Sequence, residues 1–221
     1  MSNERGVMVA TGSLFVVTAP SGAGKTSLVR ALLESLPELR FSISCTTRPR
    51  RPGERDGEDY FFLDRAEFER RVEAGEFLEH ARVFDHYYGT DRRQVEALLR
   101  AGHDVILEID WQGARQVRSA MPECLSVFVL PPSRAELERR LRDRGQDSGA
   151  VIARRLSDAV TDMSHYGEFD YLVVNDKFLT AADELRSIFV ARRMRVPAQR
   201  ARHAHLIAEL LGQPTPEVGG S

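Results

Sequence analysis

Cysteines and long apolar runs are scarce in this sequence, and their scarcity excludes several classes of protein. The two cysteines among 221 residues, Cys45 and Cys124, are too few for a disulfide scaffold or a cysteine-based metal site, so we expect reduced thiols. The longest apolar runs, such as 14–17, are far shorter than the roughly 20 residues of a membrane-spanning helix. Residues 1–12 contain charged side chains and no long apolar core, so we expect no signal peptide. We therefore expect a cytoplasmic protein without membrane partners.

Neither sign of charge is in excess. The chain has 31 Lys and Arg residues against 33 Asp and Glu residues, a net charge of −2, with 42% hydrophobic and 29% charged residues. These values are typical of a globular protein and argue against disorder, a fibre or a nucleic-acid coat. At roughly 150 residues per domain, the length suits one main domain with sizeable insertions and a buried core. Only Lys25 and Lys177 are lysine, and a lysine retained in so arginine-rich a chain points to chemistry that arginine cannot perform.

Apolar, β-branched runs alternate with amphipathic helical patterns along the chain. The runs predict buried strands at 14–18, 105–109, 126–130 and 171–174. The helical patterns predict helices over 25–36, from Asp64 to Gly75, from Thr90 or Asp91 to Gly102, from Ser133 to Gly145, and after a capping box of Thr180 and Asp183. This alternation predicts an α/β domain with a mostly parallel sheet.

The segment from residue 41 to about 90 breaks this rhythm. It begins with alternating residues at 41–45, continues with a polar, turn-rich run at 48–57, and then has aromatic residues at 60–62. This composition predicts a small inserted α+β subdomain. We expect the aromatic residues at 60–62 and Trp111 to be core residues.

A glycine-rich turn lies between the first predicted strand and the first predicted helix. It matches the pattern G-x-x-x-x-G-K-[ST] except that Ala19 replaces the first glycine, and its position argues against a chance glycine-rich turn. Backbone N–H groups and the helix N-terminus would bind phosphate oxygens. Lys25 would reach the β- and γ-phosphates of ATP, and the Thr26 hydroxyl would ligate Mg²⁺. The predicted ATP-binding residues here are Ala19, Pro20, Ser21, Gly22, Ala23, Gly24, Lys25 and Thr26.

Three more segments carry candidate functional groups. Asp110 ends a predicted strand, where a P-loop enzyme places an acid, so we favour a metal-proximal or substrate-contacting role. Arg48 and Arg51 can bind a phosphate through two hydrogen bonds each, although their segment also suits a solvated turn. Glu79 lies among apolar and aromatic residues, which is equally typical of a binding site and of an ordinary strand and turn.

On these segments the sequence resembles the guanylate kinase family. The matching segments are 19–26, 44–48, 57–60, 87–89, 108–113 and 174–176. The resemblance implies a P-loop NTPase-like core with a mostly parallel sheet, an inserted nucleotide-monophosphate-binding subdomain and a helical lid. The implied boundaries are 13–40, 97–132 and 156–211 for the core, 41–96 for the GMP-binding subdomain, 133–155 for the lid, and 1–12 and 212–221 for the tails.

The resemblance also implies an activity and the residues that perform it. The activity is reversible transfer of the γ-phosphoryl group of ATP to GMP, giving ADP and GDP in purine nucleotide metabolism, with Mg²⁺. The GMP phosphate would be bound by Arg48, Arg51, Tyr60 and Tyr88, and the guanine side would involve Ser44, Glu79, Thr90 and Asp110. The ATP phosphates would be bound by Arg140, Arg144 and Arg155, with Asn175 near the adenine, and the catalytic residues would be Lys25, Arg48, Arg140, Arg144 and Arg155.

Guanine chemistry agrees with this assignment. A carboxylate such as that of Glu79 can accept both the N1–H and the N2–H of guanine, and a hydroxyl such as that of Thr90 can donate to O6. Adenine has no N1–H, so such a site rejects it strongly.

Two rival functions stay open at the level of the sequence. One is a non-catalytic interaction module, and retention of Lys25, Thr26 and the lid arginines argues against it. The other is a P-loop kinase for another nucleotide. An arginine-rich solvated helix remains the alternative for the lid. The basic run 192–202 is most simply a solvated face, so we expect no nucleic-acid partner, and the scattered histidines predict no zinc site. The sequence leaves the oligomeric state open.

Overall fold

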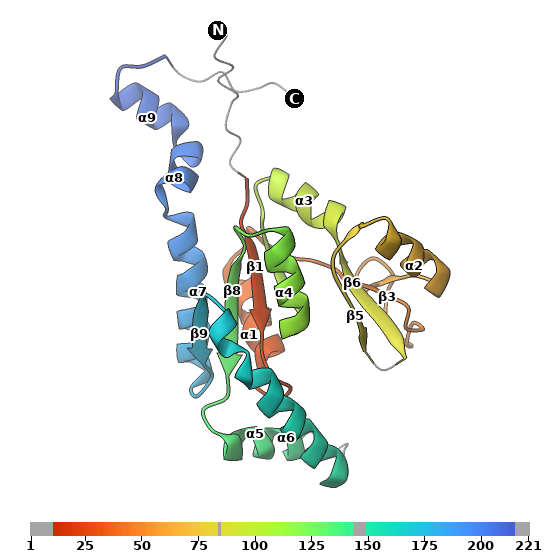
Figure 1. Ribbon diagram of the computed structural model, residues 1–221. Helices are drawn as coiled ribbons and strands as arrows, with labels where there is room; N and C mark the ends of the chain where they lie inside the picture. The colour runs from red at the N-terminus through yellow and green to blue at the C-terminus, as the bar shows by residue number, and fades with distance from the viewer. Residues whose placement is uncertain (1–10, 84, 144–148, 215–221) are drawn as a thin grey trace.

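A parallel sheet of five strands forms the centre of the molecule (Figure 1). The computed structural model describes residues 11–83, 85–143 and 149–214. The strands pair in the order β2-β7-β1-β8-β9, and every neighbouring pair is parallel. They are β1 (Leu14–Thr18), β2 (Leu39–Phe41), β7 (Asp104–Glu108), β8 (Leu125–Leu130) and β9 (Tyr171–Val174). The predicted α/β fold with a mostly parallel sheet is therefore confirmed.

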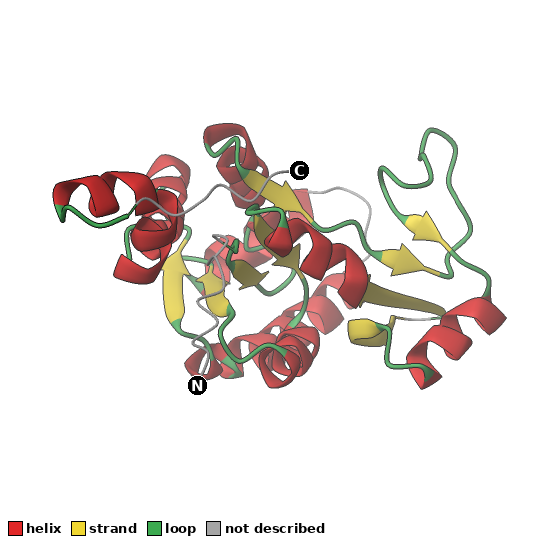
Figure 2. Ribbon diagram, turned by 90° about the horizontal axis from the view of Figure 1, so that it is seen from above, coloured by secondary structure: helices red, strands yellow, loops and turns green. Residues whose placement is uncertain are grey.

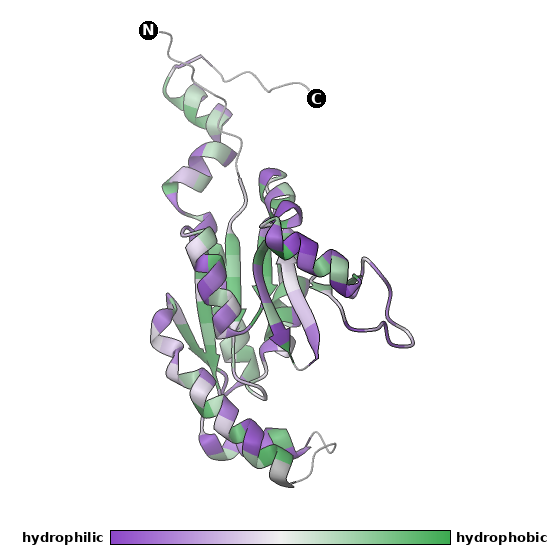
Figure 3. Ribbon diagram, turned by 45° about the vertical axis from the view of Figure 1, so that its right-hand side comes forward, coloured by the Kyte–Doolittle hydropathy of each residue, from purple (hydrophilic) through white to green (hydrophobic). Residues whose placement is uncertain are grey.

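Helices cover both faces of this sheet, which explains why every residue of β1 is buried. On one face, Phe15 and Val17 pack with α1 (Lys25–Ser35) and α7 (Phe178–Arg193), and the rings of Phe15 and Phe189 stack at 3.8 Å. On the other face, Leu14 and Val16 pack with α3 (Arg92–Arg100) and α4 (Trp111–Ala120). Figure 3 shows the central strands in the green of apolar residues between helices with purple outer faces.

A second sheet lies beside the first and forms the predicted α+β insertion (Figure 1). Its strand order is β4-β3-β6-β5, so β5 is an edge strand. The elements are β3 (Cys45–Thr46), β4 (Phe61–Phe62), α2 (Arg65–Glu73), β5 (Phe77–Val83) and β6 (His86–Asp91). Phe68 and Phe77 pack on Cys45 in a small core of its own, against which Phe61 also lies. A long loop, green in Figure 2, joins β3 and β4.

Two antiparallel helices extend below the carboxyl ends of the central strands (Figure 1). They are α5 (Arg134–Asp143) and α6 (Gly149–Ser164), and their apolar residues form a separate cluster around Leu137, Leu141 and Ile152. Helix α6 continues nine residues past the predicted end of the lid at residue 155. After it come the 3₁₀ turn Tyr166–Glu168, β9, α7, α8 (Val196–Arg202) and α9 (Ala204–Leu210). None of the helices in the described ranges is long and apolar enough to span a bilayer.

Several local predictions are confirmed. The side chains of Asp64, Asp91 and Ser133 accept hydrogen bonds from the backbone three residues on, so they cap α2, α3 and α5 as expected. Both cysteines are buried free thiols, and burial raises the pKa of each to about 11. The predicted helix end at Gly145 and most of the predicted C-terminal tail, 215–221, lie outside the described residues.

Other local predictions are wrong. Helix α7 begins at Phe178, two residues before the predicted capping box at Thr180, because β9 ends at Val174 and Lys177 already precedes the first turn of the helix. The strand expected over 41–45 is divided between β2 and β3, because the chain leaves one sheet and enters the other there. Trp111 is half-buried at a helix junction and is not a core residue. Helix α4 was not predicted, and α6 was expected only as far as residue 155, as part of the helical lid.

Candidate active site

The glycine-rich turn connects β1 to α1 at the carboxyl edge of the sheet, as predicted. Gly22 and Gly24 have φ angles of 91° and 92°, a conformation that favours glycine. A Cβ atom on Gly24 would lie 2.4 Å from Nδ2 of Asn175, so the close approach of Asn175 also requires glycine. Ala19, which replaces the first motif glycine, packs partly buried against the core of α1 and α7. The turn therefore has glycine at both positions where the backbone conformation favours it.

Lys25 lies where β1 and β7 end side by side. Its Nζ donates a hydrogen bond to the carbonyl oxygen of Ile109 at 3.1 Å. The side chain is half-buried, and loss of water around the ammonium lowers the pKa of Lys25 below its usual value. The carboxylates of Glu108, Asp110 and Asp162 oppose that shift. The ammonium is therefore a fixed, poorly hydrated positive charge, which suits binding of phosphate oxygens.

Oxygen donors for a magnesium ion lie next to the turn. The Thr26 hydroxyl donates to Oε1 of Glu108 at 2.5 Å, so a hydroxyl oxygen and a carboxylate oxygen lie next to each other. Mg²⁺ takes oxygen ligands and usually keeps only one or two from protein, with phosphates and water completing the set. Within the described part of the chain no group of three His, Cys, Asp or Glu side chains could hold a metal. The donors present therefore fit a magnesium ion that arrives with a nucleotide.

Asp110, for which we expected a metal-proximal or substrate-contacting role, lies at the start of α4. Its Oδ1 accepts a hydrogen bond from the Gly113 backbone N–H at 2.8 Å, which makes Asp110 the N-cap of α4. The acid beside Thr26 is Glu108. Asp110 still lies close to Glu79, because a Cβ atom on Gly113 would lie 3.4 Å from Oδ1 of Asp110 and 3.0 Å from Oε2 of Glu79.

Asn175, which we expected near the adenine, lies against the turn together with Arg140. Asn175 donates from Nδ2 to the Ala23 carbonyl at 2.7 Å, and Arg140 donates to the carbonyls of Asn175 at 3.1 Å and Ala23 at 3.4 Å. Glu136 also binds the Arg140 guanidinium. A cavity of about 390 Å³ opens here, and its lining residues are Gly22, Gly24, Ser27, Arg140, Asp143, Asn175, Asp176 and Phe178.

The other two predicted lid arginines are placed less fully. Arg155 lies half-buried on α6. Arg144 lies outside the described residues, as do residues 145–148.

The second sheet brings together three of the four residues expected at the GMP phosphate. The Arg48 guanidinium lies 5.3 Å from the centre of the Tyr60 ring. The Tyr60 and Tyr88 rings are 6.0 Å apart. Arg48 also forms a two-bond ion pair with Glu54, at 3.0 and 2.7 Å. Arg51 is exposed and touches this group through its backbone N–H, which donates to Glu54.

The residues expected on the guanine side surround a buried carboxyl group. Glu79 is 6% exposed, and its Oε1 accepts a hydrogen bond from the Thr90 hydroxyl at 2.7 Å. Burial raises the pKa of Glu79 to about 7, with a further contribution from Asp110. Because the single hydroxyl hydrogen of Thr90 is used for Glu79, it does not donate to guanine O6 in this conformation. Ser44 is half-buried nearby, with its carbonyl bonded to the Phe61 N–H.

Residues 108–113 connect the two groups of residues. Glu108 accepts a hydrogen bond from the Thr26 hydroxyl, and the Ile109 carbonyl accepts one from Lys25 at 3.1 Å. A Cβ atom on Gly113 would lie 3.0 Å from Oε2 of Glu79 in the second sheet. The phosphate-binding turn and Glu79 therefore approach the same short segment, an arrangement suited to two nucleotide ligands.

Comparison with known proteins agrees with this geometry. The family model of guanylate kinase matches residues 11–192 of the chain. This chain belongs to the guanylate kinase family. The resemblance found in the sequence is therefore confirmed.

Relatives match nearly the whole chain. The guanylate kinase of Methylococcus capsulatus is 59% identical over 201 residues, covering 91% of this chain and 98% of that protein. The guanylate kinase of Escherichia coli K12 is 54% identical over 205 residues, covering 92% and 99%. The crystal structure of guanylate kinase from Anaplasma phagocytophilum superposes with a TM-score of 0.70 at 33% identity, covering 94% of this chain and 99% of that one.

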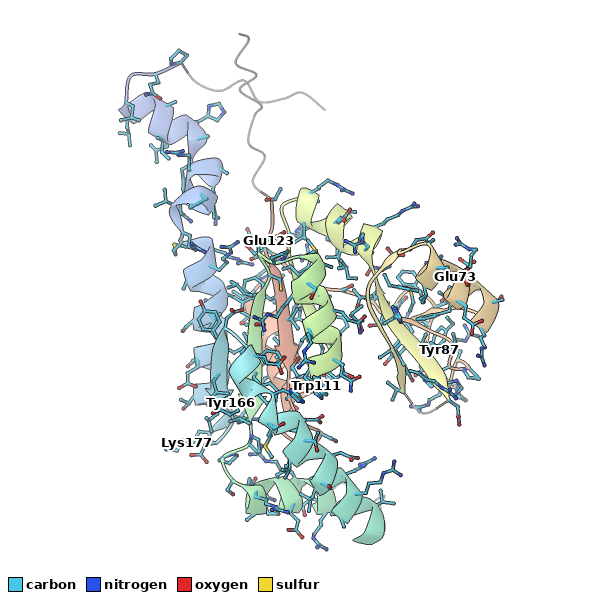
Figure 4. The ribbon with its side chains drawn as sticks, in the orientation of Figure 1. Glu73, Tyr87, Trp111, Glu123, Tyr166 and Lys177 are labelled. Carbon is cyan, nitrogen blue, oxygen red and sulfur yellow. The ribbon has the colours of Figure 1, made fainter. Side chains whose placement is uncertain are left out.

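Sequence reasoning missed several residues of this guanylate kinase site. Glu54 was absent from the predicted set, and no local pattern marks it. Glu108 was also absent, although it lies near the end of the predicted strand 105–109 and in the matching segment 108–113. Asp162 was also missed: it lies on α6, and its charge opposes the lowering of the pKa of Lys25. The Trp111 ring stacks on His165 at 3.6 Å, which ties α4 to the end of α6 (Figure 4). The lid helix is thereby attached to the helix that Asp110 caps.

Proposed function

We propose that this chain transfers the γ-phosphoryl group of ATP to GMP, reversibly giving ADP and GDP, in purine nucleotide metabolism. The observation that carries the proposal is that residues 108–113 contact both the phosphate-binding turn, through Lys25 and Thr26, and Glu79 of the second sheet. The donor would bind at the turn, and the acceptor would bind beside Glu79 and Arg48. Membership of the guanylate kinase family supports the same substrates.

The acceptor in this reaction is a phosphate anion, which is already a nucleophile. The protein therefore needs to position the two substrates and stabilise charge, and no general base is required. Lys25 and the arginines at 140, 144 and 155 would bind the ATP phosphates, with Asn175 beside the adenine. Thr26 and Glu108 would hold the Mg²⁺ that comes with ATP, directly or through water. That ion would neutralise developing charge on the phosphoryl oxygens.

Arg48 would be the main ligand of the GMP phosphate, with Arg51, Tyr60 and Tyr88. In the structure its guanidinium is held by Glu54 and stacked over Tyr60. A phosphate dianion carries more charge than the Glu54 carboxylate and can take over the two-bond contact. Glu54 thus keeps the guanidinium in place for an incoming phosphate. The subdomain 41–96 and the lid 133–155 would close over both substrates and exclude water.

Glu79 would select guanine. Its ionised carboxylate can accept both the N1–H and the N2–H, and its buried position leaves water unable to substitute for them. Ser44, Thr90 and Asp110 would complete this side of the site, with Thr90 orienting Glu79 by the 2.7 Å hydrogen bond.

A coupled assay of ADP release with equal concentrations of GMP, IMP, AMP and CMP tests the proposal. We expect turnover with GMP to exceed turnover with each of the others by several orders of magnitude. Faster turnover with another nucleotide would establish the rival kinase. Absence of ADP release with all four would establish a binding module.

Replacing Arg48 with alanine is expected to lower kcat/KM for GMP by about a hundredfold or more, because the acceptor phosphate loses its charged ligand. The KM for ATP should stay within a factor of about two, since Arg48 lies in the loop that joins β3 to β4 of the second sheet. Arg55→Ala is a matched control from the same loop, where Arg55 forms an exposed pair with Glu58. Equal losses in the two variants would contradict the role of Arg48.

A further inference from the structure

The edge strand β5 is attached to helix α4 by one side chain. The Oε1 atom of Gln116 accepts a hydrogen bond from the backbone N–H of His80 at 3.1 Å. The Nε2 atom of Gln116 donates to the backbone carbonyl of the same residue, also at 3.1 Å. His80 directly follows Glu79, the residue proposed to select guanine.

A glutamine side chain suits this position for a clear reason. On its inner side β5 pairs with β6, where His80 lies opposite Gly89, and no strand of the sheet lies beyond β5. An edge strand presents a row of N–H and C=O groups that need partners. A primary amide has one donor and one acceptor group at adjacent positions, so Gln116 satisfies both groups of His80 as a neighbouring strand would.

The same helix approaches Glu79 itself. Gly113 lies three residues before Gln116, on the same face of α4. A Cβ atom on Gly113 would lie 3.0 Å from Oε2 of Glu79. Leu78, which directly precedes Glu79 in β5, is buried in the core cluster that contains Val117 of α4. Residues 78–80 of β5 are therefore fixed to α4 and the central core, while Arg48 lies in the loop between β3 and β4.

We propose that Gln116 is a positioning residue for base selection, which holds the outer edge of β5 against α4 and thereby fixes the Glu79 carboxylate at the guanine site. This inference rests on the proposed function of Glu79. Gln116 itself touches neither substrate. Its effect is transmitted through the backbone of His80.

The direct test is Gln116→Met, which keeps the length of the side chain and removes both hydrogen bonds. We expect the KM for GMP to rise about tenfold, with kcat and the KM for ATP changed by less than about twofold. The selectivity for GMP over IMP, which lacks the 2-amino group, should fall by several-fold. Ser119→Ala is the control, because Ser119 lies on the exposed end of α4 and binds only within the helix.

A double-mutant cycle separates positioning from a general loss of stability. If Gln116 acts through Glu79, then Gln116→Met in a Glu79→Gln background should change the KM for GMP by less than about twofold. An equal rise in both backgrounds, or no rise in the parent chain, would overturn the inference. Should Gln116→Met fail to fold, Gln116→Asn is the second variant, since its shorter amide cannot span to His80. The expected results and the overturning results are the same for Gln116→Asn.

Failure of the proposed function of Glu79 would give a different pattern of results from failure of the inference about Gln116. If Glu79→Gln alone left the selectivity between GMP and IMP unchanged, the guanine role of Glu79 would be wrong, and with it the basis of the inference. If Glu79→Gln lowered the selectivity while Gln116→Met did not, only the positioning role of Gln116 would be overturned.

Discussion

Lys25→Ala is expected to lower kcat/KM by about a thousandfold or more, with most of the loss in kcat. The ammonium of Lys25 is held by the Ile109 carbonyl and is poorly hydrated, so its charge acts on a phosphate with little screening by water. Around it are the carboxylates of Glu108, Asp110 and Asp162, which would repel a polyphosphate once the lysine is removed.

The chain supplies its own control for this experiment. Lys177 is the other lysine of the sequence, and it is exposed before the start of α7, on the left of Figure 4. Lys177→Ala should retain kcat/KM within about threefold, because the residue caps no helix through its side chain. Steady-state rates of ADP release measure both variants. A Lys25→Ala protein with nearly the parent rate would exclude the role given to the phosphate-binding turn.

Glu79→Gln is expected to have opposite effects on selectivity and on stability. Glutamine keeps the shape of the side chain and can still accept the hydrogen bond from Thr90. It cannot accept hydrogen bonds from both N1–H and N2–H of guanine, because one of its two terminal groups is a donor. We expect kcat/KM for GMP to fall by about two to three orders of magnitude, with a much smaller change for IMP.

The stability effect follows from the raised pKa of Glu79. Folding shifts this pKa from an ordinary value of 4.5 to about 7, so the native state favours the protonated form. The stability that the protonated Glu79 carboxyl group gives to the folded state is fully present below about pH 4.5 and is lost as the pH rises through about 7. Above that pH the folded protein bears a cost on the order of 3 kcal/mol for the buried carboxylate.

Glu79→Gln removes this cost. The Tm of the variant should exceed that of the parent by roughly 5 to 10 °C at pH 8 and should match it near pH 4.5. Calorimetry at the two pH values measures the difference. Glu123→Gln replaces an exposed carboxylate after α4 and should show no such change between the two pH values. A Tm difference that is equal at both pH values would contradict the titration of Glu79.

Substrate binding should report the same titration. The KM of the parent for GMP should fall as the pH rises from 6 to 8, because guanine needs the ionised carboxylate. The GMP phosphate also titrates in this range, and it does so equally with both proteins. The difference between the pH profiles of the parent and of Glu79→Gln therefore isolates the carboxyl group. Identical profiles would show that Glu79 does not bind the base.

Local sequence patterns predicted much of this molecule. The turn at 19–26, the central strands and the caps at Asp64 and Asp91 follow from contacts between residues a few positions apart, which a sequence displays directly. The family resemblance extended the prediction to Arg48, Glu79 and Tyr88.

Only the tertiary structure decided how the functional groups pair. From the sequence, Glu108 and Asp110 are equally good candidates for an acid near the phosphate-binding turn, because both lie near the end of β7. Packing of α4 makes Asp110 a helix cap and leaves Glu108 beside Thr26. Gln116 meets His80 across 36 positions, and Thr26 meets Glu108 across 82. No periodicity in the chain records such pairs, because they depend on how the elements pack. The types of residue at the site were therefore set by the sequence, while their partners were set by the fold.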